Sequence, residues 1–181
     1  MEAREVLRNR RSVRDFTDDK VDRDILLDIL ETSTFSPSWS NFQPIRYNII
    51  ENEDLKNKIA ENCFMGYALN SKILKRAAGV IVLSYVDNLS GTYSLSSNQS
   101  KKGDTWAMFD AGIVANQFAL ASYDKGLSSV ILGYFDEDKL SDILKIRDGE
   151  IIAAIIAYGY EKKHPNTPKR KSLNEVVRFF D

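Results

Sequence analysis

The sequence of 181 residues contains a single cysteine, Cys63, and a single histidine, His164. One chain can therefore form no internal disulfide, no all-cysteine zinc site and no cysteine-ligated iron–sulfur cluster. A metal site with two histidines is excluded within one chain for the same reason. A serine–histidine–aspartate triad would have to use His164. We therefore expect no bound metal and no catalysis of these kinds.

Glycine is also sparse, because no two of the nine glycines are closer than seven residues. This spacing excludes the G-x-G-x-x-G turn of dinucleotide-binding domains and the Walker A loop. Any nucleotide phosphate must then be held by side chains and isolated backbone amides.

Long apolar segments are missing as well. The longest mostly apolar run, residues 151–158, has about half of the ~20 residues that a membrane-spanning helix needs. Residues 1–11 contain no apolar signal core. The sequence therefore favours a cytoplasmic protein that does not interact with membranes.

Charge is balanced overall but clustered locally. A net charge of −1 argues against bulk attraction to nucleic acid. Ten of the 25 basic residues nevertheless lie in two short segments near the ends of the chain: Arg4, Arg8, Arg10, Arg11 and Arg14, then Lys162, Lys163, Lys169, Arg170 and Lys171. These clusters are either solvated tails or two halves of one anion site.

Hydrophobic periodicity predicts one domain over residues 1–181, since no Pro/Gly-rich linker divides the chain. Expected helices span residues 2–9, 22–33, 54–61, 106–125 and 136–144, with a further helical stretch before residue 77. Expected strands span residues 47–50, 79–86, 128–132 and 151–157, and residues 87–104 form a long lid or binding loop. This alternation by itself suggests a parallel α/β sheet. The apolar residues 176–180 need a cover, from this domain or from a second subunit.

Five motifs occur in order along the chain. They are R-R-S-V-R-D-F at residues 10–16, S-P-S-W-S-N-F-Q-P at 36–44, D-A-G-I-V-A-N-Q at 110–117, G-Y-F-D at 133–136 and Y-G-Y-x7-P-K-R-K-S-L-x-E-V-V at 158–177. Together they resemble the nitroreductase family of FMN-dependent oxidoreductases. The resemblance implies an α+β, nitroreductase-like fold with a central, mostly antiparallel sheet flanked by helices. It also implies an intertwined homodimer, with an extension of about residues 160–181 packing on the partner subunit.

The resemblance assigns the first motif to the FMN phosphate and ribityl chain. Arg10, Ser12 and Arg14 point the same way if the segment is extended, and guanidiniums make charge-assisted bonds to a dianion. The neighbouring Arg11 belongs to the same predicted site, and Arg170 with Lys169 joins it from the C-terminal cluster. The alternative for Arg14 is a surface salt bridge with Asp15 or Asp18.

The second motif matches the loop that reaches the flavin from the partner subunit. Its side chains can donate and accept hydrogen bonds at a pyrimidine-like ring edge. Trp39 stacks near the flavin, narrows the pocket or packs in the interface. The predicted contacts are Pro37, Ser38, Trp39, Asn41 and Gln43.

Further predicted contacts lie at the flavin ring. Asn70 matches an asparagine that points at the pyrimidine end, although a surface role is equally compatible with its position. Leu132, Gly133 and Tyr134 supply the backbone turn beside the redox-active nitrogen, with Gly-Tyr where some members have Glu-Gly. The candidates to cover the flavin face, or else to pack in the core, are Tyr93, Trp106 and Phe109.

The implied activity is hydride transfer from NAD(P)H through FMN to a nitroaromatic or quinone. One pocket used twice predicts ping-pong kinetics, and no catalytic side chain is required because the flavin carries the chemistry. The same fold is also compatible with reductive dehalogenation, with flavin fragmentation, or with flavin binding without turnover.

Overall fold

Four strands form one antiparallel sheet in the order β1-β2-β6-β5. They are β1 (Ile45–Ile50), β2 (Gly79–Val86), β6 (Glu150–Gly159) and β5 (Ser128–Leu132). The computed structural model describes residues 1–93, 96–103 and 105–180, and the side chains of residues 93–99 are outside that description. The antiparallel sheet expected from the resemblance is confirmed. The parallel sheet suggested by alternating element types is wrong, because a helix between two strands does not fix their relative direction.

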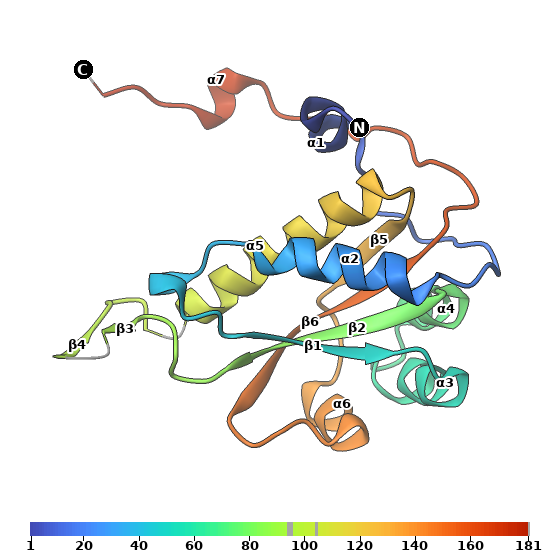
Figure 1. Cartoon of the computed structure of the whole chain (residues 1–181), viewed down its shortest axis with the longest axis horizontal. Helices are drawn as coiled ribbons and strands as arrows, with labels where there is room; N and C mark the ends of the chain where they lie inside the picture. The colour runs from blue at the N-terminus through green and yellow to red at the C-terminus, as the bar shows by residue number, and fades with distance from the viewer. Residues whose placement is uncertain (94–95, 104, 181) are drawn as a thin grey trace.

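Helices cover both faces of this sheet (Figure 1). α2 (Arg23–Thr34) and α5 (Thr105–Asp124) lie on one face. α3 (Glu53–Asn62), α4 (Ala68–Arg76) and α6 (Glu137–Leu144) lie on the other. The two layers of helices explain why the central strand β2 is buried from Gly79 to Tyr85 and is mostly apolar.

The side chains of β2 divide the core into two clusters. Val80 and Val82 pack with residues of α3, α4 and α6, whereas Ile81 and Leu83 pack with α2 and α5. Successive side chains of a strand point to opposite faces, so one strand supplies both cores. The helices begin where short polar residues cap them: the side chains of Asp22, Asn52 and Asp136 accept hydrogen bonds from backbone N–H groups of α2, α3 and α6.

α5 is the longest helix and connects two distant parts of the chain. The N-terminal amine, next to α1 (Ala3–Asn9), donates to the carboxylate of Asp124 at the end of α5, at 2.7 Å. The backbone N–H of Trp39, in the 3-10 turn η1 (Trp39–Asn41), donates to Asp110 near its beginning. Asp110 and Asp124 are fourteen helical positions apart, which is about 21 Å along the axis.

The long loop predicted at residues 87–104 contains a small hairpin, β3 (Thr92–Tyr93) and β4 (Ser96–Gln99). Periodicity missed it because its serines and asparagine have low strand propensity. Among the described helices, none combines the length and the apolar character needed to cross a membrane.

The C-terminal segment leaves the body of the molecule beside α1 (Figure 1). It contains one short helix, α7 (Leu173–Val176), which begins with a capping box between Ser172 and Glu175. Phe179 and Phe180 are 87% and 92% exposed. The same chain therefore does not cover these apolar side chains.

Candidate functional site

An extended segment, residues 12–17, lies between β5 and the beginning of the C-terminal segment. The N–H of Val13 donates to Ser129 of β5 at 3.1 Å, and the N–H of Thr17 donates to Tyr160 at 2.8 Å. The Val13 side chain is buried and the Arg14 side chain is exposed. Alternation along this segment therefore directs Ser12 and Arg14 away from the core.

The two basic clusters meet around one cleft of about 430 Å³. Within the part of the chain that the structure describes, no carboxylate lies within ion-pair distance of Arg10, Arg14 or Arg170. The lining residues are Arg10, Arg11, Ser12, Arg14, Pro165, Asn166, Pro168 and Arg170. Solvated, separate tails do not describe this arrangement, whereas an anion site does.

The pKa of Arg10 reflects the positive charge gathered in the cleft. Burial lowers the pKa of its guanidinium, and the positive charges of Arg11 and Arg170 lower it further. Like charges held together without a counter-ion are unfavourable, and a bound dianion would relieve that repulsion. The donor set of this basic cleft therefore fits a phosphate group.

Arg11 has a different environment from its neighbours. Its guanidinium is buried and donates to the carbonyl oxygens of Arg8 (2.6 Å) and Arg10 (2.9 Å), and to the hydroxyl of Thr167. Its Nε is buried and has no hydrogen-bond partner among the described residues. Arg11 therefore ties the end of α1 to the C-terminal segment. Thr167 carried no signal in the sequence.

The salt bridge considered for Arg14 is not present in the described structure. Asp15 instead pairs with Arg76 at 2.7 Å and approaches Lys162 at 4.0 Å. The hydrogen bond from Arg76 is the main reason why the pKa of Asp15 lies below its ordinary value. Among the described residues, Arg14 donates one hydrogen bond, to the carbonyl of Ser12 at 3.3 Å. Its guanidinium is available to a ligand.

A second group of predicted residues lies at the far end of β5. The buried Asn70 donates its side-chain N–H to the carbonyl of Tyr134 at 3.1 Å. Tyr134 makes an edge contact with Tyr67, with ring centroids 5.7 Å apart. Tyr67 lies three residues before Asn70 and was not singled out in the sequence.

One edge of β5 connects the basic cleft to this turn. The five residues from Ser129 to Gly133 span about 13 Å of extended chain. Ser129 pairs with Ser12 at the cleft, and Gly133 begins the turn. The residues predicted to contact the phosphate and those predicted to contact the flavin ring therefore lie along one edge of β5. The residues of the loop assigned to the partner subunit do not lie there.

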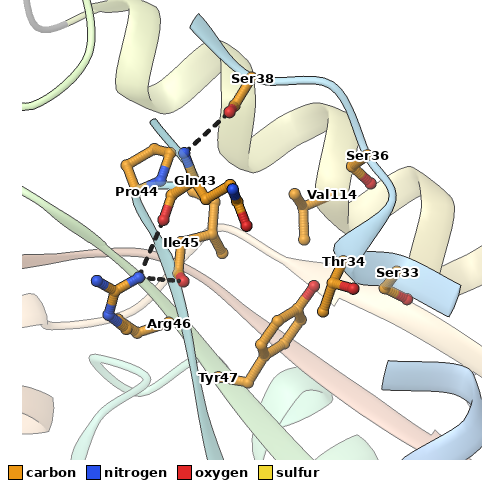
Figure 2. A pocket seen from close by; sticks show the side chains of 10 residues that line it. All are labelled: Ser33, Thr34, Ser36, Ser38, Gln43, Pro44, Ile45, Arg46, Tyr47 and Val114. Carbon is orange, nitrogen blue, oxygen red and sulfur yellow. Dashed lines mark hydrogen bonds between the residues drawn. The ribbon is translucent and has the colours of Figure 1, made fainter. Parts of the chain in front are cut away.

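The remaining predicted contacts lie in the loop of residues 36–44, at the other end of α5. Three of its residues have positive φ without being glycine: Ser40 (47°), Asn41 (57°) and Gln43 (50°). This conformation is unfavourable for residues with a Cβ. The loop is closed by Ser38, whose Oγ accepts from the N–H of Gln43 at 3.0 Å (Figure 2).

A cavity of about 130 Å³ lies behind this loop. Figure 2 shows the amide of Gln43 and the hydroxyl of Tyr47 pointing toward its centre, beside Val114 of α5. Burial raises the pKa of Tyr47 to about 12, so its hydroxyl remains protonated at neutral pH. Arg46 supports the loop from outside by donating to the carbonyls of Gln43 (3.0 Å) and Ile45 (2.9 Å).

Aromatic residues from separate segments pack together beside this loop. The rings of Trp39 and Trp106 are 4.8 Å apart, and those of Trp106 and Phe109 are 5.4 Å apart. The Trp39 Nε1 donates to the carbonyl of Thr92 at 3.0 Å. We call Trp39, Trp106 and Phe109 the aromatic cluster. The third predicted lid residue, Tyr93, has a side chain outside the described residues.

The basic cleft and the aromatic cluster are therefore at opposite ends of α5. Within one chain they do not form a common site. A ligand that contacts both would need the loop of a second copy, as the resemblance implies.

The described residues support neither a metal site nor a cysteine nucleophile. In the part of the chain that the structure describes, no group of three histidine, cysteine, aspartate or glutamate side chains is placed to hold a metal ion. Cys63 is buried, and burial raises the pKa of its thiol. A thiol with a raised pKa is a poor nucleophile.

The antiparallel sheet with helices on both faces and the basic cleft define an α+β protein with a candidate phosphate site, and sequence comparison identifies the family. The model of the Nitroreductase family matches residues 7–160, so the chain belongs to the nitroreductase family.

Individual relatives agree with this assignment. An oxygen-insensitive NADPH nitroreductase from Helicobacter acinonychis is 27% identical, over 85% of this chain and 84% of that protein. An iodotyrosine deiodinase from Hydra vulgaris is 26% identical, over 95% of this chain and 70% of that protein. A solved complex with FMN from Exiguobacterium sibiricum has a TM-score of 0.85 at 19% identity, over 99% and 98% of the two chains. The last similarity shows the fold.

Proposed function

We propose that the protein is an FMN-dependent oxidoreductase that passes hydride from NAD(P)H to an electron-poor aromatic acceptor, as a homodimer with the flavin site at the subunit interface. The basic cleft carries this proposal, because four arginines without carboxylate partners among the described residues surround a space that suits a phosphate. Family membership supports the activity, as do the NADPH nitroreductase from Helicobacter acinonychis and the FMN complex from Exiguobacterium sibiricum.

In this proposal the phosphate is held by Arg10, Ser12, Arg14 and Arg170. Arg11 acts on the cleft indirectly, by fixing the carbonyls of Arg8 and Arg10, and Lys169 adds positive charge beside Arg170. Charge-assisted bonds from planar guanidiniums give a phosphate both energy and orientation.

The turn at Leu132, Gly133 and Tyr134 offers its backbone to the ring, and Asn70 keeps that turn in place through Tyr134. Bound FMN supplies the hydride-transfer chemistry. The opposite edge of the ring is contacted by the loop of the partner subunit, through the residues predicted above: Pro37, Ser38, Trp39, Asn41 and Gln43. Asn41 and Gln43 are suited to this role because amides both donate and accept hydrogen bonds.

The aromatic cluster would form a wall of the pocket in which donor and acceptor alternate. Planar apolar walls favour planar aromatic acceptors. Since both reactants use one pocket, we expect ping-pong kinetics, with protons supplied by solvent. The C-terminal extension packs on the partner subunit and buries Phe179 and Phe180 there.

The test is the visible absorption spectrum of the purified protein after incubation with FMN, before and after anaerobic NADH or NADPH. We expect a protein-bound flavin spectrum that bleaches with at least one of the two donors. A flavin that binds and does not bleach would contradict the proposed activity. No flavin binding would contradict the assignment of the basic cleft.

The relative from Hydra vulgaris motivates one second candidate, reductive dehalogenation at the same site. The two candidates differ in the acceptor. Reoxidation of the reduced protein by nitroarenes but not by halophenols favours the first, and the reverse pattern favours the second.

A further inference from the structure

Asp110 is a buried carboxylate that links two segments far from it in the sequence. Its side chain lies on the first part of α5, and the residue is 2% exposed. Both carboxylate oxygens accept from the backbone N–H of Trp39 at 3.2 Å. Oδ2 also accepts from the hydroxyl of Ser90 at 2.7 Å, and Ser90 is fully buried.

No cation lies within ion-pair distance of Asp110 in the described ranges. A buried charge without a counter-ion is unfavourable, so hydrogen bonds must compensate it. Its neighbours on the buried side of the helix are Ala107, Ala111 and Val114. An apolar residue would suit this position better if helix packing were the only requirement.

The bonds of Asp110 act on the part of the loop that most needs support. Trp39 precedes the three residues with positive φ, and a backbone in that conformation persists only where its surroundings fix it. The carboxylate fixes the N–H of Trp39. The indole Nε1 of Trp39 donates to the carbonyl of Thr92, and its ring packs against that of Trp106.

Ser90 extends the same connection to the segment that leads into the hairpin β3–β4. Ser90 and Thr92 are two residues apart, and they contact Asp110 and Trp39 respectively. One carboxylate therefore joins the loop, the start of the hairpin segment and α5.

We propose that Asp110 is a positioning residue, which holds the Trp39 loop and the Ser90 segment together and so fixes the indole of Trp39 as a wall of the flavin site on the partner subunit. The connection itself is intrachain, whereas its effect on flavin and acceptor rests on the proposed function. The expected consequence is loss of order at Trp39 when the carboxylate is changed, with the basic cleft at the other end of α5 left intact.

The principal variant is Asp110→Asn in the full chain, because asparagine keeps the shape and removes the charge and one acceptor. The matched control is Asp124→Asn, which changes an exposed carboxylate on the same helix; the asparagine oxygen can still accept the hydrogen bond from the N-terminal amine. The first readout needs no flavin: circular dichroism of the apoprotein detects the coupled indoles of Trp39 and Trp106, and Trp39→Phe identifies their band.

We expect Asp110→Asn to lose most of that band, as Trp39→Phe does, while Asp124→Asn retains it. The Kd for FMN should rise about tenfold in Asp110→Asn, consistent with weakening hydrogen bonds to a charged acceptor. The KM for a nitroaromatic acceptor should rise more than kcat falls. The control should stay within about twofold of the unchanged protein, the range of an ordinary surface substitution.

Two results would overturn the proposal: an unchanged indole band in folded Asp110→Asn, or a loss of FMN affinity that Asp124→Asn shares. If Asp110→Asn does not fold, Ser90→Ala tests the same connection while keeping the carboxylate. It should weaken the band and raise the Kd for FMN about threefold, and no change in either would contradict the proposal. If the unchanged protein binds no FMN, the proposed function fails, whereas the indole band still decides the role of Asp110.

Discussion

The two ends of α5 present two different kinds of binding surface. At its C-terminal end, the basic cleft consists of charged side chains on an extended segment that pairs with β5. No carboxylate among the described residues lies within ion-pair distance of its arginines. At its N-terminal end, the aromatic cluster sits beside a loop of unfavourable backbone conformation that a buried carboxylate supports. In the proposed function, the first end holds a dianion within one chain, and the second end contacts a ligand that is bound to another copy.

The largest expected effect is at the basic cleft. Replacing Arg10 and Arg14 together by alanine removes two charge-assisted contacts, each contributing about 1.5–3 kcal/mol. The Kd for FMN should rise roughly 10²- to 10⁴-fold, measured by quenching of flavin fluorescence. Arg4→Ala is the matched control, since it removes an exposed charge from the same N-terminal cluster. A double variant that purifies with stoichiometric flavin would show that the cleft does not hold the phosphate.

The next largest effect is on dimer formation, through which the basic cleft of one copy would meet the aromatic cluster of another. Phe179→Ser with Phe180→Ser should raise the dimer dissociation constant at least tenfold, because burying one phenylalanine contributes about 1.5–3 kcal/mol. Analytical ultracentrifugation measures this, with Arg178→Ala as the control. A dimer of unchanged affinity would mean that these side chains pack elsewhere.

A smaller effect is expected at the turn after β5. Asn70→Ala removes the donor to the carbonyl of Tyr134 in a partly buried hydrogen bond and should reduce the free energy of unfolding by about 0.5–1.5 kcal/mol. Urea unfolding measures the loss. Asn62→Ala, which removes an exposed amide bonded within its own helix, should cost less than about 0.5 kcal/mol. Equal losses in both variants would argue against a role of Asn70 in fixing the turn.

The smallest effect is the contribution of Asp15, which joins the basic-cleft segment to α4. Arg76 lowers the pKa of Asp15 in the folded protein, so the pair stabilises the fold above the unfolded pKa of about 3.9. That stabilisation is lost as pH falls through the lower, folded value. Asp15→Asn should therefore lower Tm slightly at pH 7 and not at pH 2, with Asp18→Asn as the control. A difference that grows on acidification would contradict this account.

Local sequence predicted the elements that frame the basic cleft. β5 spans the predicted residues 128–132 and β2 the predicted residues 79–86, and α5 ends at Asp124, two residues before Gly126 with its φ of +79°. The apolar runs and the capping residues carry this information without reference to the rest of the chain. The sequence placed Arg11 and Arg14 in one predicted site, whereas the structure buries Arg11 and leaves Arg14 exposed.

The sequence did not predict the contacts that hold the Trp39 loop at the N-terminal end of α5. Asp110 and Trp39 are 71 residues apart, and Asp110 and Ser90 are 20 apart. No periodicity links them, because the contacts arise only when α5 is packed on the sheet. The same holds for Arg11 and Thr167, and for the salt bridge from Arg76 to Asp15.

The sequence by itself thus determined the principal helices and strands, though not the hairpin β3–β4, because these elements depend on local propensity and side-chain periodicity. It also determined which segments carry clustered charge. Two basic clusters remained compatible with tails or with one site until the pairing of residues 12–17 with β5 brought them together. The direction of the strands, the burial of Asp110 and the separation of the two ends of α5 were decided by the tertiary structure. Each of these depends on burying apolar faces against one another, and the sequence of a single segment does not specify its partner.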